Sequence, residues 1–254
     1  MKEPAPDRTA ALLLPTETTT EVSAGDADVA VLPIGSFEQH GPCLPLVTDT
    51  VVACALSRRI AAAHRVLSLP PITVSCSHEH AYWAGTVSIS AATLYHMVRD
   101  IADSLRRSGI RSLVLVNGHG GNYVLRNVVQ ESAGWGIRMA LFPESADWKA
   151  ARETAGISTS AHDDMHAGEI ETSILLHTHP ELLRPGHEST DRSAGDRRHL
   201  LTLGMREYTT TGVLGRPSRA TAEKGAALLD SLTESFGAYH ALLRGPGAQD
   251  GDGS

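Results

Sequence analysis

The sequence has few cysteines, no cluster of basic residues and no long apolar run. Its three cysteines, Cys43, Cys54 and Cys76, are odd in number and widely spaced, which excludes a disulfide framework and a zinc-ribbon pattern. Without a Lys/Arg cluster, nucleic acid and anionic membrane surfaces are disfavoured as partners. No apolar window is long enough to span a membrane, and the first residues lack the pattern of a signal peptide. We therefore expect a cytoplasmic protein.

The composition is that of an ordinary globular protein with a modest excess of acidic residues. Hydrophobic residues make up 41% of the 254 residues and charged residues 20%. Acidic residues outnumber basic ones by 29 to 22, and the net charge of −7 indicates solubility rather than a particular partner. This length fits one large domain or two small ones, and a single α/β domain of this size is common. We predict a polar N-terminal arm at residues 1–26, one domain at 27–244 and a disordered tail at 245–254.

Apolar periodicity predicts strands that alternate with helices. The predicted strands are 28–35, 65–75, 112–117 and 137–143, and the predicted helices are 49–63, 91–107, 123–134, 169–177 and 220–243. Residues 184–212 are polar and irregular and should form a long surface loop. The alternation predicts an α/β fold, a single-domain, mostly parallel sheet flanked by helices. Ligands of such folds bind beyond the carboxyl ends of the strands.

Three ionisable side chains follow the first predicted strand. Glu38 and His40 lie two residues apart on an extended segment, so their side chains face the same way. Asp49 comes nine residues after His40, beyond a loop stiffened by two prolines. The three residues are compatible with a metal site, although Asp49 could instead be a simple N-cap of the next helix.

A glycine-rich loop, NGHGGN at residues 117–122, follows the third predicted strand. Its glycines indicate a close approach of the backbone or a positive φ. Neither of the glycine-rich phosphate-binding patterns is present, and no lysine lies nearby. We therefore favour His119 as a metal ligand over a phosphate cradle or a plain strand-to-helix turn.

Two further segments combine histidine with acidic or aromatic residues. DDMHAGEIETS, residues 163–173, could be an acidic helix start, but this leaves His166 unexplained and makes it a candidate general acid or base. SHEHAYWAGTVSIS, residues 77–90, places His80, Tyr82 and Trp83 close together in a chain with only 4% aromatic residues. These side chains could form a pocket wall or a packed loop.

The carboxylates and imidazoles together suit a pair of divalent ions. The candidate ligands are Glu38, His40, Asp49, His119 and one of Glu169 or Glu171. Nitrogen and oxygen ligands without thiolate favour Zn²⁺, with Mn²⁺ or Fe²⁺ as alternatives. Two such ions can activate a water molecule and polarise a scissile carbonyl group.

The four motifs, in this order, resemble those of the creatininase (creatinine amidohydrolase) family. They are GSFEQHGPCLPLVTD, SHEHAYWAGTVSIS, VNGHGGN and DMHAGEIETS, and they cover about residues 28–180. The resemblance implies an α/β metal-dependent amidohydrolase that often assembles as a hexamer. It implies that Glu38, Asp49 and His119 hold one ion and that His40, Asp49 and Glu171 hold a second.

The resemblance also assigns other residues. His166 matches the catalytic histidine of the family, and Ser77 and His80 match positions near the substrate. Creatininases carry Tyr-Glu where this chain has Gly120-Gly121, which argues against creatinine as the substrate. We interpret Glu169 as a replacement for that missing glutamate.

We therefore predict an amidohydrolase that cleaves the C–N bond of a small cyclic amide, a lactam or a formamide. His166 and Glu169 are the predicted catalytic residues, and the predicted substrate-binding residues are Ser77, His80, Trp83, Gly120 and Asp164. One alternative is a precursor-peptide peptidase of the mycofactocin type, which usually has Arg-Thr where this chain has Glu169-Ile170. The other is a metal-binding scaffold protein that has lost catalysis.

Overall fold

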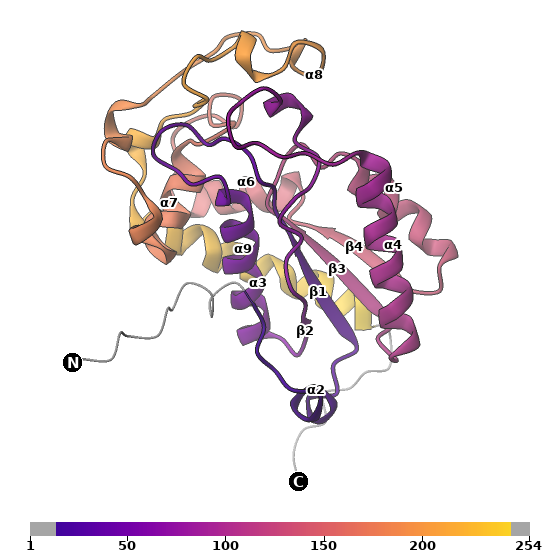
Figure 1. The fold of residues 1–254 in the computed structure, drawn as a ribbon. Helices are drawn as coiled ribbons and strands as arrows, with labels where there is room; N and C mark the ends of the chain where they lie inside the picture. Colours follow the sequence, from indigo (N-terminus) through magenta and orange to yellow (C-terminus); the bar gives the residue numbers. More distant parts are fainter. Residues whose placement is uncertain (1–13, 245–254) are drawn as a thin grey trace, which may run out of the picture.

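The fold is built on a four-stranded parallel sheet. The computed structural model describes residues 14–244, and its strand order is β2-β1-β3-β4 (Figure 1). The strands are β1 (Val29–Ile34), β2 (Leu67–Ser68), β3 (Ser112–Asn117) and β4 (Arg138–Phe142). The α/β class and the parallel sheet are confirmed. Residues 1–13 of the predicted arm and the whole predicted tail lie outside the described residues.

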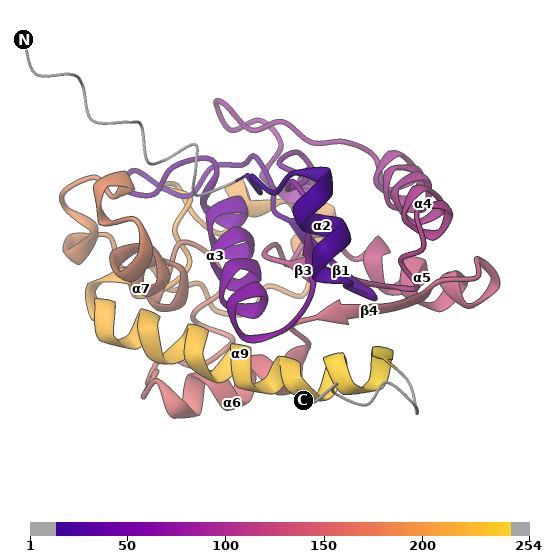
Figure 2. The same cartoon turned by 90° about the horizontal axis from the view of Figure 1, so that it is seen from below.

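Helices cover both faces of the sheet. The α-helices are α2 (Thr19–Gly25), α3 (Thr48–Ala63), α4 (Ala91–Arg107), α5 (Val124–Glu131), α6 (Ser145–Thr154), α7 (Glu169–Thr178), α8 (Leu200–Leu203) and α9 (Ala222–Arg244). Short 3₁₀ helices are η1 (His78–His80), η2 (Ser132–Gly134), η3 (Pro180–Leu182), η4 (His187–Ser189), η5 (Met205–Glu207) and η6 (Pro217–Arg219). Figure 2 shows α6 and α9 below the sheet, with α4 and α5 together at one side.

The central strands alternate between two hydrophobic cores. Val31 and Val114 point into the core formed with α3, α7 and α9, while Leu32 and Leu115 point into the core formed with α4 and α5. A strand turns successive side chains to opposite faces, so a fully apolar strand serves both cores. This explains why β1 is buried along its whole length.

The second strand is much shorter than predicted. Only Leu67–Ser68 pair with β1, and one isolated bridge joins Ile34 to Ile72 further along. Pro70 and Pro71 stand between these two pairings. Proline has no backbone N–H to donate, so it interrupts the ladder on this edge strand.

The strand order places the site. β2 lies on one side of β1, and β3 and β4 lie on the other, so the order in which strands are added to the sheet reverses between β1 and β3. Ligands of open α/β sheets bind at such a switch point. Both strands are parallel, so the segments after Ile34 and after Asn117 leave the same edge of the sheet. The segment 184–212 lies at the end of the molecule opposite α2 (Figure 1). Within residues 14–244, no helix has the length and apolar character needed to cross a membrane.

Candidate metal centre

The ionisable residues of four segments meet beyond the carboxyl ends of β1 and β3. Glu38 and His40 follow β1, Asp49 lies in the first turn of α3, His119 follows β3 and Glu171 lies in the first turn of α7. All but Glu171 are buried. The N-cap of α3 is Val47 rather than Asp49, so the carboxylate of Asp49 is not used as a cap.

Asp49 lies between two histidines. Its Oδ1 is 3.1 Å from Nε2 of His40, and its Oδ2 is 3.0 Å from Nδ1 of His119. The hydroxyl of Ser36 donates to Oδ2 at 2.7 Å and holds the carboxylate in place. Each oxygen of Asp49 therefore faces a different imidazole, which is the arrangement of a bridging carboxylate.

The other ring nitrogens of these two histidines face backbone carbonyl groups. Nδ1 of His40 lies 3.1 Å from the carbonyl oxygen of Glu38, and Nε2 of His119 lies 2.9 Å from that of Cys76. A carbonyl oxygen only accepts, so these nitrogens carry the hydrogens. When these rings are neutral, His40 Nε2 and His119 Nδ1 are the nitrogens whose lone pairs can bind a cation. Histidines that bind metals commonly donate their second N–H in this way.

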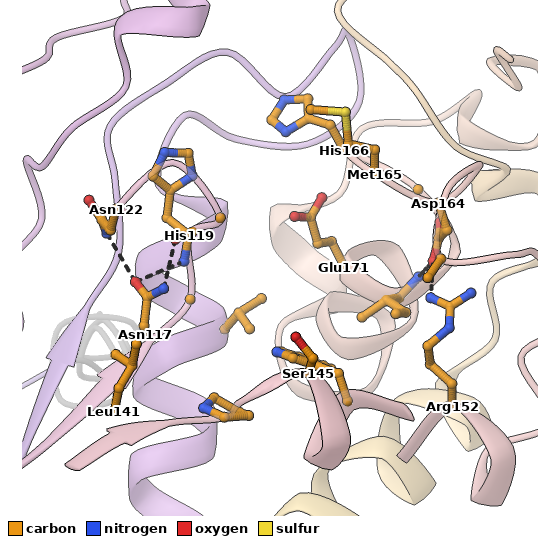
Figure 3. A pocket seen from close by; sticks show the side chains of 18 of the residues that line it. Asn117, His119, Asn122, Leu141, Ser145, Arg152, Asp164, Met165, His166 and Glu171 are labelled. Atoms are coloured by element: carbon orange, nitrogen blue, oxygen red, sulfur yellow. Dashed lines mark hydrogen bonds and ion pairs between the residues drawn. The ribbon is translucent and has the colours of Figure 1, made fainter. Parts of the chain in front are cut away.

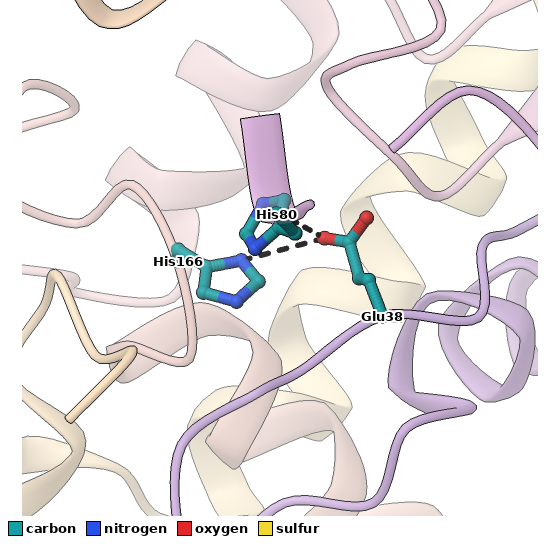
Figure 4. Close-up of side chains that lie close together, drawn as sticks. All are labelled: Glu38, His80 and His166. Carbon is teal, nitrogen blue, oxygen red and sulfur yellow. Dashed lines mark ion pairs between the residues drawn. The ribbon is translucent and has the colours of Figure 1, made fainter. Parts of the chain in front are cut away.

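Glu38 is a buried carboxylate without a hydrogen bond. Neither of its oxygens has a hydrogen-bond partner, although three histidines lie near. Its Oε1 is 3.2 Å from Nε2 of His80 and 3.7 Å from Nδ1 of His166, as Figure 4 shows, and its Oε2 is 3.2 Å from Nε2 of His119. Burying an unsatisfied carboxylate is costly, so a cation bound here would stabilise its charged form.

Glu171 and His166 complete the cluster. The backbone N–H of Ala167 donates to Oε2 of Glu171 at 2.6 Å, and that oxygen lies 3.9 Å from Nε2 of His40. His166 packs beside His40 with ring centroids 4.2 Å apart. Its backbone pairs with Leu214 in an isolated antiparallel bridge, which brings the segment after α8 to the site.

Burial and charge shift the pKa values of the acidic residues in opposite directions. Burial raises the pKa of Glu38 to about 7 and that of Glu171 to about 8. Burial would also raise the pKa of Asp49, but the adjacent His40 and His119 outweigh it and hold the pKa well below its usual range.

The histidines fall into two pairs. Burial lowers the pKa of His40 and His119, but nearby carboxylates, chiefly Asp49 and Glu38 respectively, reverse this and raise both values to about 10. Burial and the positive charge of neighbouring histidines lower the pKa of His80 to about 3 and that of His166 well below its usual range. Without a bound cation the first pair is therefore positively charged at neutral pH, and the second pair is neutral.

The residues fit divalent cations. Three sets offer ligand atoms within 4.8 Å of one another, and these sets are Glu38 with His40 and Asp49, His40 with His166 and Glu171, and Glu38 with His80 and His166. The unsatisfied oxygens of Glu38 and, once deprotonated, the ring nitrogens of His40 and His119 that face Asp49 supply the oxygen and nitrogen donors that Zn²⁺ and Mn²⁺ prefer.

A cavity of about 520 Å³ opens beside the cluster. His119, Gly120, His166 and Glu171 line it, as do Trp148 and Arg152. In Figure 3 the carboxylate of Glu171 points into the space between His119 and His166. This volume suits a small molecule or a short peptide end.

Glu169 does not lie with the cluster. Its Oε2 accepts a hydrogen bond from the Thr159 hydroxyl at 2.5 Å, and its Oε1 lies 2.5 Å from Nζ of Lys224. The structure therefore gives this buried carboxylate a structural partner instead of a place beside the substrate. Of the two glutamates considered as the fifth ligand, only Glu171 faces the site.

Asp164 lines the cavity, but its carboxylate is occupied. It accepts from the backbone N–H groups of Glu169 and Ile170, at 2.5 and 3.2 Å, and pairs with Arg152 at 3.3 Å. The N-cap position of α7 is Gly168, which has no side chain to cap the helix. Asp164 takes over that function and so fixes the helix that carries Glu171.

The other predicted substrate residues are dispersed. His80 belongs to the cluster, and Gly120 lines the cavity and has open space around it. Ser77 is buried, with its hydroxyl lacking a hydrogen-bond partner. Trp83 is not part of the cavity lining, and the guanidinium of Arg206 lies 5.4 Å from the centre of its ring.

Sequence reasoning missed two polar residues that touch the cluster. Gln39 contacts both His80 and His166, and Glu79 lies 3.7 Å from Nε2 of His119. The only sequence signal for Gln39 was its position between the predicted ligands Glu38 and His40. Gly121 leaves room for Glu79, because a Cβ there would collide with its carboxylate.

The comparisons with known proteins decide the family. The Creatininase family model, described as creatinine amidohydrolase, matches residues 15–239. The chain belongs to the creatininase family. It is a hydrolase of C–N bonds, like the creatinine amidohydrolase and the deformylase among its relatives.

Named relatives of this creatininase-family chain differ in what they cleave. The "Mycofactocin precursor peptide peptidase" of Mycobacterium ulcerans is 37% identical over 80% of this chain and 81% of that protein. The "Creatinine amidohydrolase" of Pseudomonas putida is 30% identical over 66% of this chain and 70% of that protein. The solved structure "Creatininase Mn" has a TM-score of 0.71 and 24% identity, over 87% of this chain and 92% of that one, which shows the shared fold.

Proposed function

We propose that this protein is a metal-dependent amidohydrolase that cleaves the C–N bond of a small amide, such as a lactam or formamide. The observation that carries the proposal is the cluster beside the cavity. In it, a buried carboxylate without hydrogen bonds, Glu38, lies next to a carboxylate shared by two histidines, Asp49. Such a set has no evident structural use, and it is well matched to two cations.

Glu38, Asp49 and His119 would hold one ion, and His40, Asp49 and Glu171 a second. Zn²⁺ or Mn²⁺ is expected, because solved creatininases include a manganese form and a zinc–zinc form. Bound ions of this kind supply Lewis acidity and a water molecule of lowered pKa.

The side chains around the cluster handle the proton and the substrate. His166 is buried and neutral at the cavity wall, so it can take the proton of the attacking water and pass it to the leaving nitrogen. Water adds to the carbonyl carbon, the C–N bond breaks, and the products are a carboxylic acid and an amine. The cavity walls position the amide, and the ordered backbone around Ala167 holds Glu171 toward it.

The first test is metal content together with turnover. Elemental analysis of the wild type should give about two divalent ions per chain, and Asp49→Ala should lower this to about one or none. His166→Ala should keep its metal and lose at least about a hundredfold in turnover of the best substrate from a panel of lactams and formamides. Metal-loaded wild type that cleaves no amide would contradict the proposal and favour a binding or scaffold role.

A second candidate is cleavage of a precursor peptide, because a peptidase of that kind is 37% identical over most of the chain. The cavity could take the end of a peptide as well as a small amide. The same panel should therefore include peptides from which a short C-terminal fragment can be released. Release of a C-terminal fragment at a higher kcat/KM than any small amide would favour the peptidase.

A further inference from the structure

Gln39 lies between the two neutral histidines of the cluster. Its Nε2 is 2.9 Å from Nδ1 of His80, 3.1 Å from Nε2 of His166 and 3.2 Å from the carbonyl oxygen of Gly212. Gln39, His80 and His166 are all at most 5% exposed. The amide nitrogen is a hydrogen-bond donor only and cannot bind a metal ion, so its contacts act on the two histidines.

Backbone groups fix which way the amide points. The N–H of Gly41 can only donate, and it lies 3.0 Å from Oε1 of Gln39. The carbonyl of Gly212 can only accept, and it faces Nε2. The amide oxygen therefore points to Gly41 and the amide nitrogen to the two imidazoles. Gly212 has a φ of +90°, and a Cβ there would collide with the amide of Gln39, so this contact requires glycine.

The backbone of Gln39 determines the hydrogen on His166. Nε2 of His166 lies 2.7 Å from the carbonyl oxygen of Gln39, which only accepts. Nε2 must therefore carry a hydrogen, and a nitrogen that carries one cannot accept from the amide. The neutral ring then has its lone pair on Nδ1, the atom that faces Glu38 at 3.7 Å (Figure 4).

The side chain of Gln39 determines the hydrogen on His80. The amide has two hydrogens, of which one goes to Gly212, and His166 cannot take the other. The second goes to Nδ1 of His80, which must be unprotonated to accept it. The hydrogen of His80 is then on Nε2, the atom 3.2 Å from Glu38.

We propose that Gln39 is a positioning residue that fixes the tautomers of His80 and His166, so that His166 presents an unprotonated Nδ1 to the cluster. Nδ1 is then the atom of His166 that receives the proton during hydrolysis. His80 also carries its hydrogen on Nε2, the atom that faces Oε1 of Glu38 at 3.2 Å. The kinetic part of this inference rests on the proposed function, while the tautomers can be observed without any substrate.

The test is ¹⁵N NMR of the full chain labelled at histidine, in the metal-free and Zn²⁺-loaded forms. Long-range ¹H–¹⁵N correlations report which ring nitrogen is protonated. In metal-free wild type, His80 and His166 should both be protonated at Nε2. In Gln39→Glu the carboxylate can only accept, so His80 should switch its hydrogen to Nδ1. In Gln39→Met, which removes both hydrogen-bonding atoms, His80 should show a mixture of tautomers.

The matched control is Thr86→Val. The hydroxyl of Thr86 accepts from the backbone N–H of Gln39 at 3.0 Å, so this variant disturbs the same residue without touching the imidazoles. Its histidine spectrum should match that of the wild type. A wild-type spectrum with the hydrogen on Nδ1 of either histidine would overturn the inference. A His80 signal that stays the same in both Gln39 variants would overturn it as well.

The kinetic arm separates positioning from structural support. With metal content equal to wild type, Gln39→Met should lower kcat by about 10- to 100-fold, while KM changes by less than about threefold. Loss of metal without a change of the His80 tautomer would show that Gln39 merely supports the ligands, and the inference would fall. If no substrate is found, the proposed function fails on its own, and the NMR result still decides the tautomers.

Discussion

The ion pair between Lys224 and Glu169 should contribute strongly to stability and little to catalysis. Glu169 is fully buried, and Lys224 is 24% exposed, with 2.5 Å between Nζ and Oε1. Lys224→Met removes the only positive side chain that pairs with this carboxylate among the described residues. The hydrogen bonds from Thr159 remain, but they do not neutralise the charge.

The expected cost can be bounded from two sides. Breaking a buried ion pair by removing one partner costs about 3–5 kcal/mol. A buried carboxylate that loses its cation can also take up a proton. Protonating an ordinary glutamate at pH 7 costs about 4 kcal/mol, so the loss of stability should not exceed this value. We expect Lys224→Met to lower the free energy of unfolding by about 3–4 kcal/mol, measured by urea denaturation at pH 7. Glu169→Gln should cost only about 1–2 kcal/mol, because Lys224 also donates to the carbonyl of Arg219 and reaches water.

An exposed ion pair of the same length is the control. Arg59 and Asp230 are also 2.5 Å apart, but their side chains are 39% and 63% exposed. Asp230→Asn should therefore cost less than about 1 kcal/mol. A cost for Lys224→Met no larger than that of the control would refute the reasoning from burial. Loss of turnover in a folded, metal-loaded Glu169→Gln variant would refute the structural role and restore Glu169 as a catalytic candidate.

Three other outcomes follow from the metal centre. Removing metal with a chelator should abolish amide hydrolysis and lower the melting temperature, and added Zn²⁺ or Mn²⁺ should restore both, as an activity assay and thermal melts would show. Gly118→Ala should lower metal content, because a Cβ at Gly118 would collide with the carbonyl oxygen of Asp49; Gly120→Ala, with open space around it, should keep its metal in elemental analysis. Asp164→Ala should cost about 1–2 kcal/mol in urea denaturation and weaken metal binding, since it uncaps the helix of Glu171.

The fold could be predicted because its signals are local. β1 is a fully apolar strand and β3 is apolar between its end residues Ser112 and Asn117, and the spacing of apolar residues in α3 and α4 gave both helices within one residue of their observed ends. α6 was missed, because most of its residues are exposed or half-buried and only Ala151 is buried. A helix that buries so little has weak apolar periodicity in its sequence.

The candidate ligands could also be predicted, but their contacts could not. Glu38, His40 and His119 follow strand ends that the sequence already marked, and parallel strands bring those ends together. Choosing between Glu169 and Glu171 as the fifth ligand required knowing which way each side chain points from α7, and the sequence does not give this. Positions two apart on a helix point to different sides, and here one side holds Lys224 and the other holds the cavity.

The site therefore depends on backbone contacts that composition does not reveal. Gly35, after β1, lies so close to Thr50 that a Cβ would collide with its backbone, and Gly118, after β3, approaches Asp49 in the same way. The two glycines let the first turn of α3 sit directly against both strand ends. Only this approach brings Asp49 between His40 and His119, with one oxygen toward each. These two glycines thus affect the chemistry by determining where the carboxylate of Asp49 lies, and not by contacting a metal ion or a substrate themselves.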